Sequence, residues 1–351
     1  MKRILVAVLC GVMSAPAALA EIPEIDSSDW ATDPRDYGMT AKEYIQAESR
    51  AFFADFIGRV GLNTFYHFPG VASAEDRFVV SPNNDTVYSV AVVNVTEGFT
   101  LELPETGDRF VSVHIVDENH MSPFYLYGGG TREFTADQFE TEYVAVGIRT
   151  GTDASEEDVR FIKEELHPNY AITGASNVDE MPRPDLDVLA RVRSALVAEY
   201  GKLSTTSGAM QPRTELVEDW EFFTYVTAGA WGLSADENAM YAPYALPEAI
   251  GGKCYTATYP PVPVKAFFSI TVYGAEKYLM SNVDNIVSSN RGVETNDDGS
   301  FTVAFGGEEC RELAPNYVYT PDDGWSLLLR AYRPEVEEFQ AYEMPELTPV
   351  E

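Results

Sequence analysis

The chain has 351 residues, of which 24 are Lys or Arg and 56 are Asp or Glu, so its formal net charge at pH 7 is −32. A surface of this sign repels phosphate groups, which argues against nucleic acid and against an anionic membrane surface as partners. The acidic residues are spread along the chain instead of forming one tail. This distribution favours solubility in a salty environment over a dedicated acidic binding arm.

Residues 1–20 have the pattern of a secretory signal peptide. Lys2 and Arg3 precede a short apolar run, and the segment ends with Ala at positions 18 and 20, which is an A-x-A cleavage pattern. The run is too short to anchor the chain stably in a membrane. We therefore expect cleavage near Ala20, a periplasmic or secreted protein without stable membrane insertion, and a mature net charge of −34 once the two basic residues are removed.

Of the three cysteines, Cys10 leaves with the signal peptide, while Cys254 and Cys310 remain. In an oxidising compartment an isolated pair is more typical of a disulfide than of a metal or redox site. A disulfide that closes a loop of this length contributes about 3–4 kcal/mol in the chain-entropy model. All four histidines lie in the N-terminal half, so a Cys–His catalytic pair is disfavoured.

Residues 21–150 are predicted to form a helix followed by a β domain. Thr40 and Glu43 have the spacing of a capping box, and apolar residues at helical spacing continue from there to about Gly61. From Val79 onward the apolar pattern changes to a period of two, which is typical of antiparallel strands. The strands are expected at residues 87–95, 99–103, 110–116, 124–127 and 143–148.

Residues 151–235 are predicted to be a helical bridging segment, and residues 236–351 a second β domain. The bridging helices are expected after Ser155 and over residues 186–200 and 215–231. The strands of the second domain are expected at residues 254–259, 266–273, 301–305 and 325–332.

The predicted fold class is therefore mainly β with helices (α+β). It comprises two antiparallel β-sandwich or jelly-roll-like domains that a helical segment bridges, and the chain is long enough to form two hydrophobic cores.

The strongest candidate site is the 81–89 motif, Ser-Pro-Asn-Asn-Asp-Thr-Val-Tyr-Ser, at the front end of a strand. On a regular strand Asn84 and Tyr88 share one face, so they can present an amide and a phenol to a ligand. We predict Asp85 and Tyr88 as catalytic residues and Asn83 and Asn84 as substrate-binding residues. The alternative is an Asx-type turn in which Asn83 and Asp85 cap backbone N–H groups.

A second group of candidates lies at the end of another strand: His114, Asp117 and His120, which we predict as catalytic residues. Together with His67 they could form a divalent-metal site or supply a general base. The alternative is that each histidine is hydrogen-bonded in place as part of the fold. No cofactor is identified, and a divalent metal is left open.

Arg109, Tyr273 and Arg330 are predicted to bind substrate. Either arginine could clamp a carboxylate or sulfate group, and a buried ion pair is the alternative for each. The sequence has no G-x-S-x-G elbow, H-E-x-x-H pair, phosphate loop or dinucleotide fingerprint.

The 81–89 motif, followed by Pro104, Arg109-Phe110 and Asp117, resembles the domain of unknown function DUF1254. The C-terminal part resembles its usual partner, DUF1214, in the following residues: Tyr255, Pro261, Pro263, residues 266–273, Asp298-Gly299-Ser300, Asn316, Trp325, Leu329-Arg330, Tyr332 and Pro334. The resemblance implies an exported bacterial protein with two β-sandwich domains and a helical part. It implies no particular reaction.

These patterns lead to two functional hypotheses. The first is an enzyme, a hydrolase or lyase, that acts on a polar small molecule or glycan fragment. The second is a non-catalytic periplasmic ligand-binding or envelope-assembly module. A site lined by titratable groups would favour the enzyme, and a flat aromatic patch would favour the module. A homo-oligomer is left open.

Overall fold

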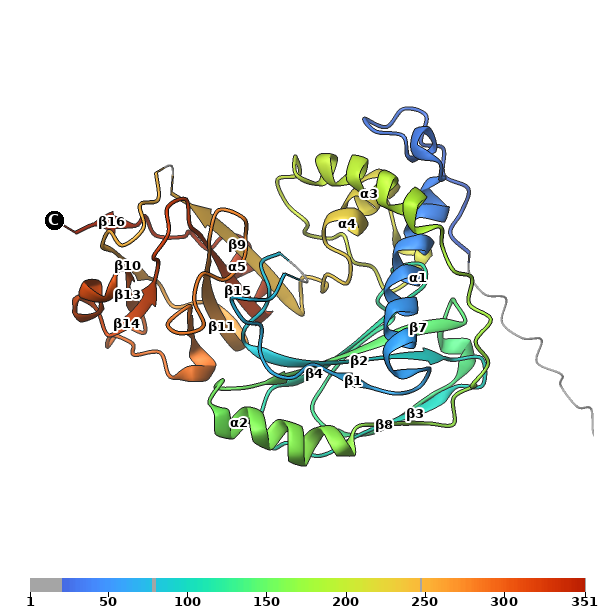
Figure 1. The fold of residues 1–351 in the computed structure, drawn as a ribbon, viewed down its shortest axis with the longest axis horizontal. Coiled ribbons are helices and arrows are strands. Elements are labelled where there is room, and N and C mark those ends of the chain that lie inside the picture. The colour runs from blue at the N-terminus through green and yellow to red at the C-terminus, as the bar shows by residue number, and fades with distance from the viewer. Residues whose placement is uncertain (1–20, 78–79, 247, 351) are drawn as a thin grey trace, which may run out of the picture.

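The computed structural model describes residues 21–77, 80–246 and 248–350; the predicted signal peptide, residues 1–20, lies outside them. The N-terminal part holds a five-stranded sheet, a three-stranded sheet and most of the helices, and the C-terminal part holds two four-stranded sheets (Figure 1). The predicted α+β class with mainly antiparallel strands is confirmed. In the described part of the chain, no helix has the length and apolar character needed to cross a membrane.

The helices begin where polar side chains satisfy their first free N–H groups. Helix α1 starts with the predicted capping box, since Thr40 accepts from the Glu43 N–H and Glu43 accepts from the Thr40 N–H. The α-helices are α1 (Ala41–Val60), α2 (Glu156–Phe161), α3 (Leu186–Tyr200), α4 (Trp220–Gly229) and α5 (Val336–Gln340). The short 3-10 or π turns are η1 (Pro34–Tyr37), η2 (Ala136–Gln138), η3 (Ile162–Leu166), η4 (His167–Asn169), η5 (Thr214–Leu216), η6 (Ser289–Arg291) and η7 (Glu308–Leu313).

The N-terminal sandwich packs a sheet of order β1-β2-β7-β4-β5 against one of order β6-β3-β8. Val87, Val113 and Val146 of the first sheet meet Leu101 and Phe134 of the second in one core. The strands are β1 (Tyr66–His67), β2 (Thr86–Asn94), β3 (Phe99–Leu103), β4 (Val111–Asp117), β5 (Phe124–Tyr127), β6 (Gly130–Phe134), β7 (Tyr143–Gly151) and β8 (Ala171–Thr173).

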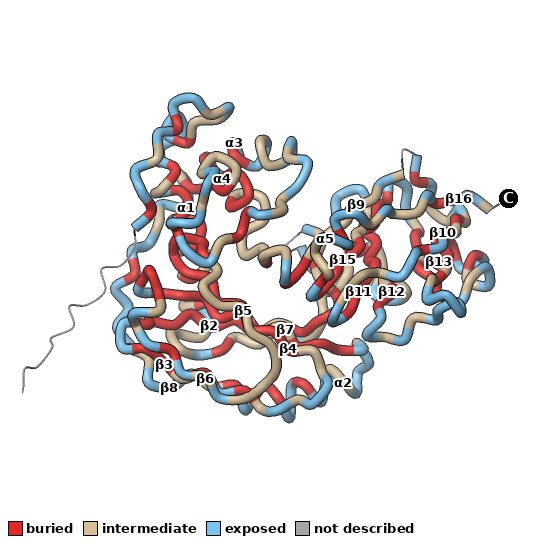
Figure 2. The backbone as a smooth tube through the Cα atoms, turned by 180° about the vertical axis from the view of Figure 1, so that it is seen from behind, coloured by how far each residue is buried: buried red, intermediate tan, exposed pale blue. Residues whose placement is uncertain are grey.

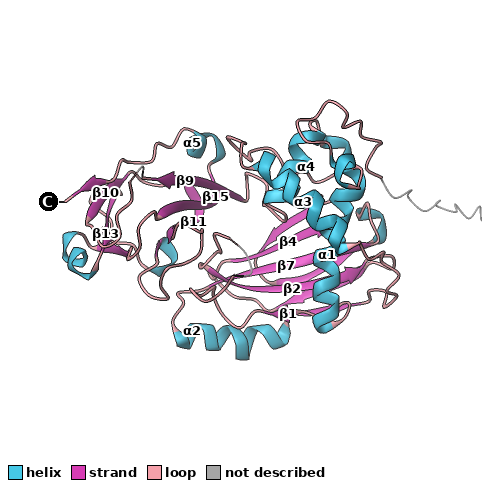
Figure 3. Cartoon of the chain, turned by 45° about the horizontal axis from the view of Figure 1, so that its top comes forward, coloured by secondary structure: helices cyan, strands magenta, loops and turns pink. Residues whose placement is uncertain are grey.

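Helix α1 covers part of the other face of the five-stranded sheet. Phe53 and Phe56 pack on Val90, Val92 and Ala145 there, and α3 and α4 pack against α1 in turn. Figure 3 shows α1, α3 and α4 gathered on this side, with α2 on the opposite side. Beyond the helices, the same sheet face carries polar side chains.

The C-terminal sandwich packs a sheet of order β14-β13-β10-β16 against one of order β12-β11-β15-β9, and only β13 and β14 are paired in parallel. Phe301 and Val303 of one sheet pack with Ile270 and Leu329 of the other, and Figure 2 shows the buried segments in red. The strands are β9 (Ala239–Ala245), β10 (Tyr255–Tyr259), β11 (Val264–Tyr273), β12 (Ile286–Ser288), β13 (Phe301–Gly306), β14 (Asn316–Tyr319), β15 (Ser326–Pro334) and β16 (Thr348–Pro349).

Several elements differ from the predicted pattern. The segment predicted to be helical also contains β8, which pairs with β3. Strand β9 was missed because Pro243 interrupts its pattern; the strand lies at the edge of its sheet, where proline is tolerated. Helix α4 begins at Trp220, later than predicted, because the Asp219 side chain caps it by accepting from the Phe222 N–H.

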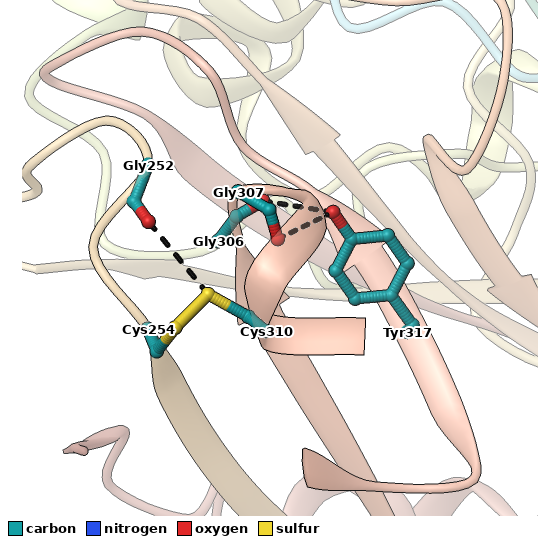
Figure 4. The surroundings of a disulfide bond; sticks show 6 residues. All are labelled: Gly252, Cys254, Gly306, Gly307, Cys310 and Tyr317. Carbon is teal, nitrogen blue, oxygen red and sulfur yellow. Dashed lines mark hydrogen bonds between the residues drawn. A yellow bond between two sulfur atoms is a disulfide. The ribbon is translucent and has the colours of Figure 1, made fainter. Parts of the chain in front are cut away.

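Cys254 and Cys310 form the disulfide that the sequence favoured, with their Cα atoms 5.4 Å apart (Figure 4). The bond ties the start of β10 to η7. The Tyr317 hydroxyl supports the same corner by donating to the carbonyls of Gly306 and Gly307. Ligand atoms of the two cysteines and Glu309 lie within 4.8 Å of one another, but the disulfide uses both sulfur atoms and leaves no thiolate for a metal.

Replacing both cysteines by alanine should lower the free energy of unfolding by about 4 kcal/mol, because the bond joins residues 56 positions apart and restricts the unfolded chain. The measurement is urea denaturation of the variant and of the oxidised and reduced wild-type protein. The reduced wild-type protein should lose a similar amount. Equal stability of all three samples would show that the bond does not stabilise the fold.

Candidate functional site

The start of the 81–89 motif forms a joint between the two sandwiches. Asp85 is fully buried, and its Oδ2 accepts hydrogen bonds from Ser269 Oγ at 2.6 Å and Tyr332 Oη at 3.1 Å. Asn83 Nδ2 also contacts Tyr332 Oη, while Asn83 Oδ1 accepts from the Asp85 N–H at 2.7 Å. Asn83 therefore makes the Asx turn of the alternative interpretation, and Asp85 binds the outer face of β11 and β15.

Three residues predicted to bind substrate also lie at this joint. Arg330 is 3% exposed and donates to the Ser81 carbonyl at 2.7 Å and to Thr271 Oγ1 at 3.2 Å. The Tyr273 hydroxyl donates to the Pro82 carbonyl. Asn84 is also buried, and its Nδ2 donates to Asn285 Oδ1 at 2.8 Å. These polar groups bind other parts of the chain across the joint.

Arg109, the fifth residue predicted to bind substrate, is ion-paired within the N-terminal part. Its Nη1 and Nη2 lie 2.9 and 2.5 Å from the two carboxylate oxygens of Asp158, and Nη1 also donates to the Gly151 carbonyl. The bidentate pair holds the start of α2 against the end of β7. For Arg109 the structure therefore shows the ion pair that was the alternative to substrate binding.

Asp117 and His120 form a tight turn after β4. Asp117 accepts from the N–H groups of Asn119 and Met121, and burial raises its pKa well above the usual range. His120 adopts a left-handed conformation with φ of 61° and bonds to Thr227 through Nδ1. Its Nε2 accepts from the Gly232 N–H at 2.8 Å. These bonds fix the helical part on the sheet.

The structure does not assemble the proposed His/Asp metal site. His67 stacks on His167, with ring centroids 4.1 Å apart, whereas His120 lies beside Trp231 and Phe223. Among the described residues, the only three metal-ligating side chains whose ligand atoms lie close together are Cys254, Glu309 and Cys310 at the disulfide corner.

Two predicted catalytic residues, Tyr88 and His114, do come together on one face of the five-stranded sheet. Strand register places Tyr88 opposite Arg149, and His114 opposite Gly147. Directly opposed residues point to the same face, so Tyr88, Arg149 and His114 share it. Tyr125 follows on the neighbouring strand, opposite His114. We call Tyr88, His114, Tyr125 and Arg149 the Arg149 cluster.

Arg149 is a partly exposed cation that pairs with no carboxylate in the part of the chain that the structure describes. Its Nη1 lies 3.3 Å from Tyr125 Oη and 3.2 Å from Ser234 Oγ, and its guanidinium lies 5.6 Å from the centre of the Tyr88 ring. No carboxylate of the described residues lies within 4.0 Å of it. Its Nε and Nη2 make no hydrogen bond to the described chain and are not buried. The N–H groups on these two nitrogens are therefore available to a ligand.

The surroundings of Arg149 leave space on the sheet face. A Cβ atom at Gly147 would meet only the His114 carbonyl oxygen within 4 Å. His114 is 6% exposed and bonds through Nε2 to Ser122 Oγ at 2.9 Å. Burial, and to a lesser extent the positive charge of Arg149, lowers the pKa of His114 well below its usual range. The imidazole is therefore neutral at pH 7 beside the charged guanidinium.

Sequence reasoning missed Arg149. It lies among Val144, Val146 and Ile148, where β7 alternates between the core and the opposite face. An arginine in such an apolar strand was the available signal, but the pattern does not show whether a carboxylate on a neighbouring strand compensates its charge.

Two family models match the chain: DUF1254, described as a protein of unknown function, over residues 62–147, and DUF1214, also of unknown function, over residues 247–336. The chain belongs to the DUF1254/DUF1214 proteins. The first match contains the Tyr88 and His114 strands, and the second contains most of the C-terminal sandwich. No curated protein sequence matches the chain.

Among solved structures, the DUF1254/DUF1214 chain is similar to the VPA0106 protein from Vibrio parahaemolyticus. The two are 16% identical with a TM-score of 0.70, and the match covers 91% of this chain and 98% of that one. An uncharacterised protein from Burkholderia cenocepacia matches with 13% identity and a TM-score of 0.49, over 87% and 84% of the two chains. The first likeness confirms a related fold.

Asp85→Ala should lower the free energy of unfolding by about 3–5 kcal/mol, because it removes one side of a buried polar joint and leaves its partners unsatisfied. Tyr332→Phe is the matched comparison and should cost about 1.5–3 kcal/mol, because it removes the hydroxyl that donates to Asp85 and contacts Asn83. Chemical denaturation measures both. A stable Asp85→Ala protein that fails to bind its ligand would instead support the predicted catalytic role of Asp85.

His120 should make stability depend on pH. Burial lowers its folded-state pKa to about 3, whereas an unfolded histidine titrates near 6.5. Its contribution is complete above about pH 6.5 and declines by about 1.4 kcal/mol per unit as the pH falls from there towards 3. His120→Asn, which tolerates the left-handed backbone, should reduce this slope in denaturation experiments between pH 4 and 6. An unchanged slope would contradict the assignment.

Proposed function

We propose that the protein binds a carboxylate-bearing polar small molecule at the Arg149 cluster. The observation that carries this proposal is an arginine whose charge no neighbouring carboxylate compensates. Removing a guanidinium from water without a counter-ion costs free energy. In a chain with 56 acidic residues, a compensating carboxylate would be easy to supply. A ligand carboxylate fits the free edge of the guanidinium through two parallel hydrogen bonds.

The side chains around Arg149 suit a polar ligand with a ring or chain of hydroxyl groups. The Tyr88 hydroxyl makes no bond to the described chain and is not buried, while Tyr125 offers a second phenol at 3.3 Å from Arg149. Aromatic faces with polar edges are common in sugar-binding sites, because they pack on C–H groups and still bond to hydroxyls. A small acidic sugar or glycan fragment therefore agrees with the cluster.

Of the two predicted reaction classes, elimination is the one for which the cluster holds every required group. Arg149 would neutralise the carboxylate and so acidify the adjacent C–H bond. Neutral His114 would take that proton as a C–C double bond forms and a C–O bond breaks. The Tyr88 hydroxyl would give its proton to the departing oxygen. We therefore propose a lyase; the non-catalytic binding module is the alternative if binding occurs without turnover.

We further propose that the protein acts in the periplasm or outside the cell. The basic start, apolar run and Ala18-Leu19-Ala20 end of residues 1–20 support export. The Cys254–Cys310 disulfide supports the same proposal, because such bonds persist in oxidising compartments.

Arg149→Gln should weaken binding of small carboxylates by about 10- to 100-fold, the loss expected when a charge-assisted hydrogen bond is removed. A thermal-shift screen with uronic acids and other hydroxy acids finds the ligand, and calorimetry then compares the variants. Arg191→Gln changes the same charge at an exposed position of α3 and should leave affinity unchanged. Unaltered binding by Arg149→Gln would contradict the site.

His114→Gln separates the reaction from binding. The variant should keep most of the affinity for the carboxylate and lose formation of the unsaturated product, which ultraviolet absorbance detects. Binding without any unsaturated product in the wild-type protein would favour the binding module over the lyase.

A further inference from the structure

A pocket lies on the other side of strand β2 from the Arg149 cluster. Its cavity volume is about 400 Å³, which is within the range of small-molecule sites. The lining residues are His67, Phe68, Pro69, Lys163, His167 and Pro168. Tyr88 and Ser89 are consecutive in β2, so their side chains point to opposite faces. Tyr88 belongs to the Arg149 cluster, and Ser89 bonds to the two histidines that line this pocket.

Two imidazoles and one buried hydroxyl form the polar part of this pocket. The rings of His67 and His167 are stacked, with centroids 4.1 Å apart and planes 14° apart. Ser89 Oγ is fully buried and lies 2.8 Å from His67 Nδ1 and 3.4 Å from His167 Nε2. Both rings are thus hydrogen-bonded to the same hydroxyl.

This shared hydroxyl links the proton positions of the two rings. Burial lowers the pKa of His67, and burial with the neighbouring His67 and Lys163 lowers that of His167 to about 4, so both rings are neutral at pH 7. The hydroxyl has a single proton: it donates to one ring and accepts from the other. The ring that accepts carries its own proton on its outer nitrogen, and the other ring has an outer lone pair. The pair therefore presents one donor and one acceptor.

Lys163 adds a positive charge at the rim. It is exposed, and its ammonium has no carboxylate of the described residues within 4.0 Å. A neutral donor, a neutral acceptor and a cation thus line one cavity. The stacked rings lie nearly parallel, so their nitrogens do not converge on one point as the ligands of a single metal ion do.

We propose that this pocket is a second ligand site, independent of the proposed lyase site, and that it binds a phosphate group that retains one proton. The P–OH group would donate to the imidazole lone pair, and the other phosphate oxygens would accept from the imidazole N–H and from Lys163. A carboxylate or sulfate offers no proton and would leave the lone pair opposite a negative oxygen. The volume also accommodates the organic part of a phosphomonoester.

The test is calorimetric titration of the mature protein with inorganic phosphate and with sulfate at about pH 6, where inorganic phosphate keeps a P–OH proton and sulfate has none. Phosphate should bind at least about tenfold more tightly, since sulfate has the same shape and lacks the proton. Glycerol phosphate in a parallel titration distinguishes a monoester site, which would bind it more tightly than phosphate, from a site for the free ion. Equal affinity for phosphate and sulfate would overturn the proposal.

Substitutions localise the site and test the shared hydroxyl. Lys163→Gln and His167→Gln should each weaken phosphate binding about tenfold or more. Lys265→Gln, an equal charge change in the C-terminal sandwich, should not. Ser89→Ala should improve sulfate binding relative to phosphate, because both rings are then free to turn an N–H outward.

Arg149→Gln separates this proposal from the proposed function. It should weaken carboxylate binding by about 10- to 100-fold and leave phosphate binding intact. If phosphate affinity falls with Arg149→Gln and not with Lys163→Gln, phosphate binds at the Arg149 cluster. That result would overturn the proposed phosphate site and leave the proposed carboxylate site in place. If the carboxylate site fails its own test, selective phosphate binding that depends on Lys163 still supports the second site.

Discussion

The buried carboxylate of Asp85 is the interaction on which the arrangement of the two sandwiches depends. A carboxylate taken out of water is tolerated only where donors and cations compensate it. Ser269 and Tyr332 supply the donors from the C-terminal sheet, and the positive charges of Arg330 and Arg291 act on the same region. Since all these partners belong to the other sandwich, Oδ2 is hydrogen-bonded only when the two parts are docked, and Oδ1 is buried without a hydrogen-bond partner among the described residues.

The joint also places the Arg149 cluster. Tyr88 lies on β2, three residues after Asp85. Because the joint fixes Asp85 at the start of this strand, it also fixes the position of the Tyr88 phenol. On the other side, Tyr241 of β9 and Tyr332 of β15 lie near enough to Arg149 to contribute to its electrostatic surroundings. The cluster itself belongs to the N-terminal sheet, but its surroundings come from both halves of the chain, so a ligand held there would also favour the docked arrangement.

The protein has a strongly negative net charge, yet both proposed sites bind an anion. The groups next to each site have to explain this binding. At about 0.1 M salt, interactions between exposed charges are largely screened beyond about 10 Å, so the net charge does not decide whether an anion binds at one point. What decides is the close surroundings: among the described residues, neither Arg149 nor Lys163 has a carboxylate within 4.0 Å. The acidic surface instead acts on solubility and on the rate at which anions approach.

The sequence by itself determined those features that depend on neighbours along the chain. The Thr40/Glu43 capping box, the strands around Val87 and Val113, the mainly β fold class and the motif at residues 81–89 are patterns of local spacing. The tertiary structure decided which side chains meet. His67 and His167 are 100 positions apart, and Arg149 meets Tyr88 only through strand register. Alternation predicts which residues share a face of one strand. It does not predict which strands lie beside that strand or which charges lie across a joint. It therefore could not show that Asp85 is buried and hydrogen-bonded whereas Arg149 is partly exposed without a carboxylate partner among the described residues.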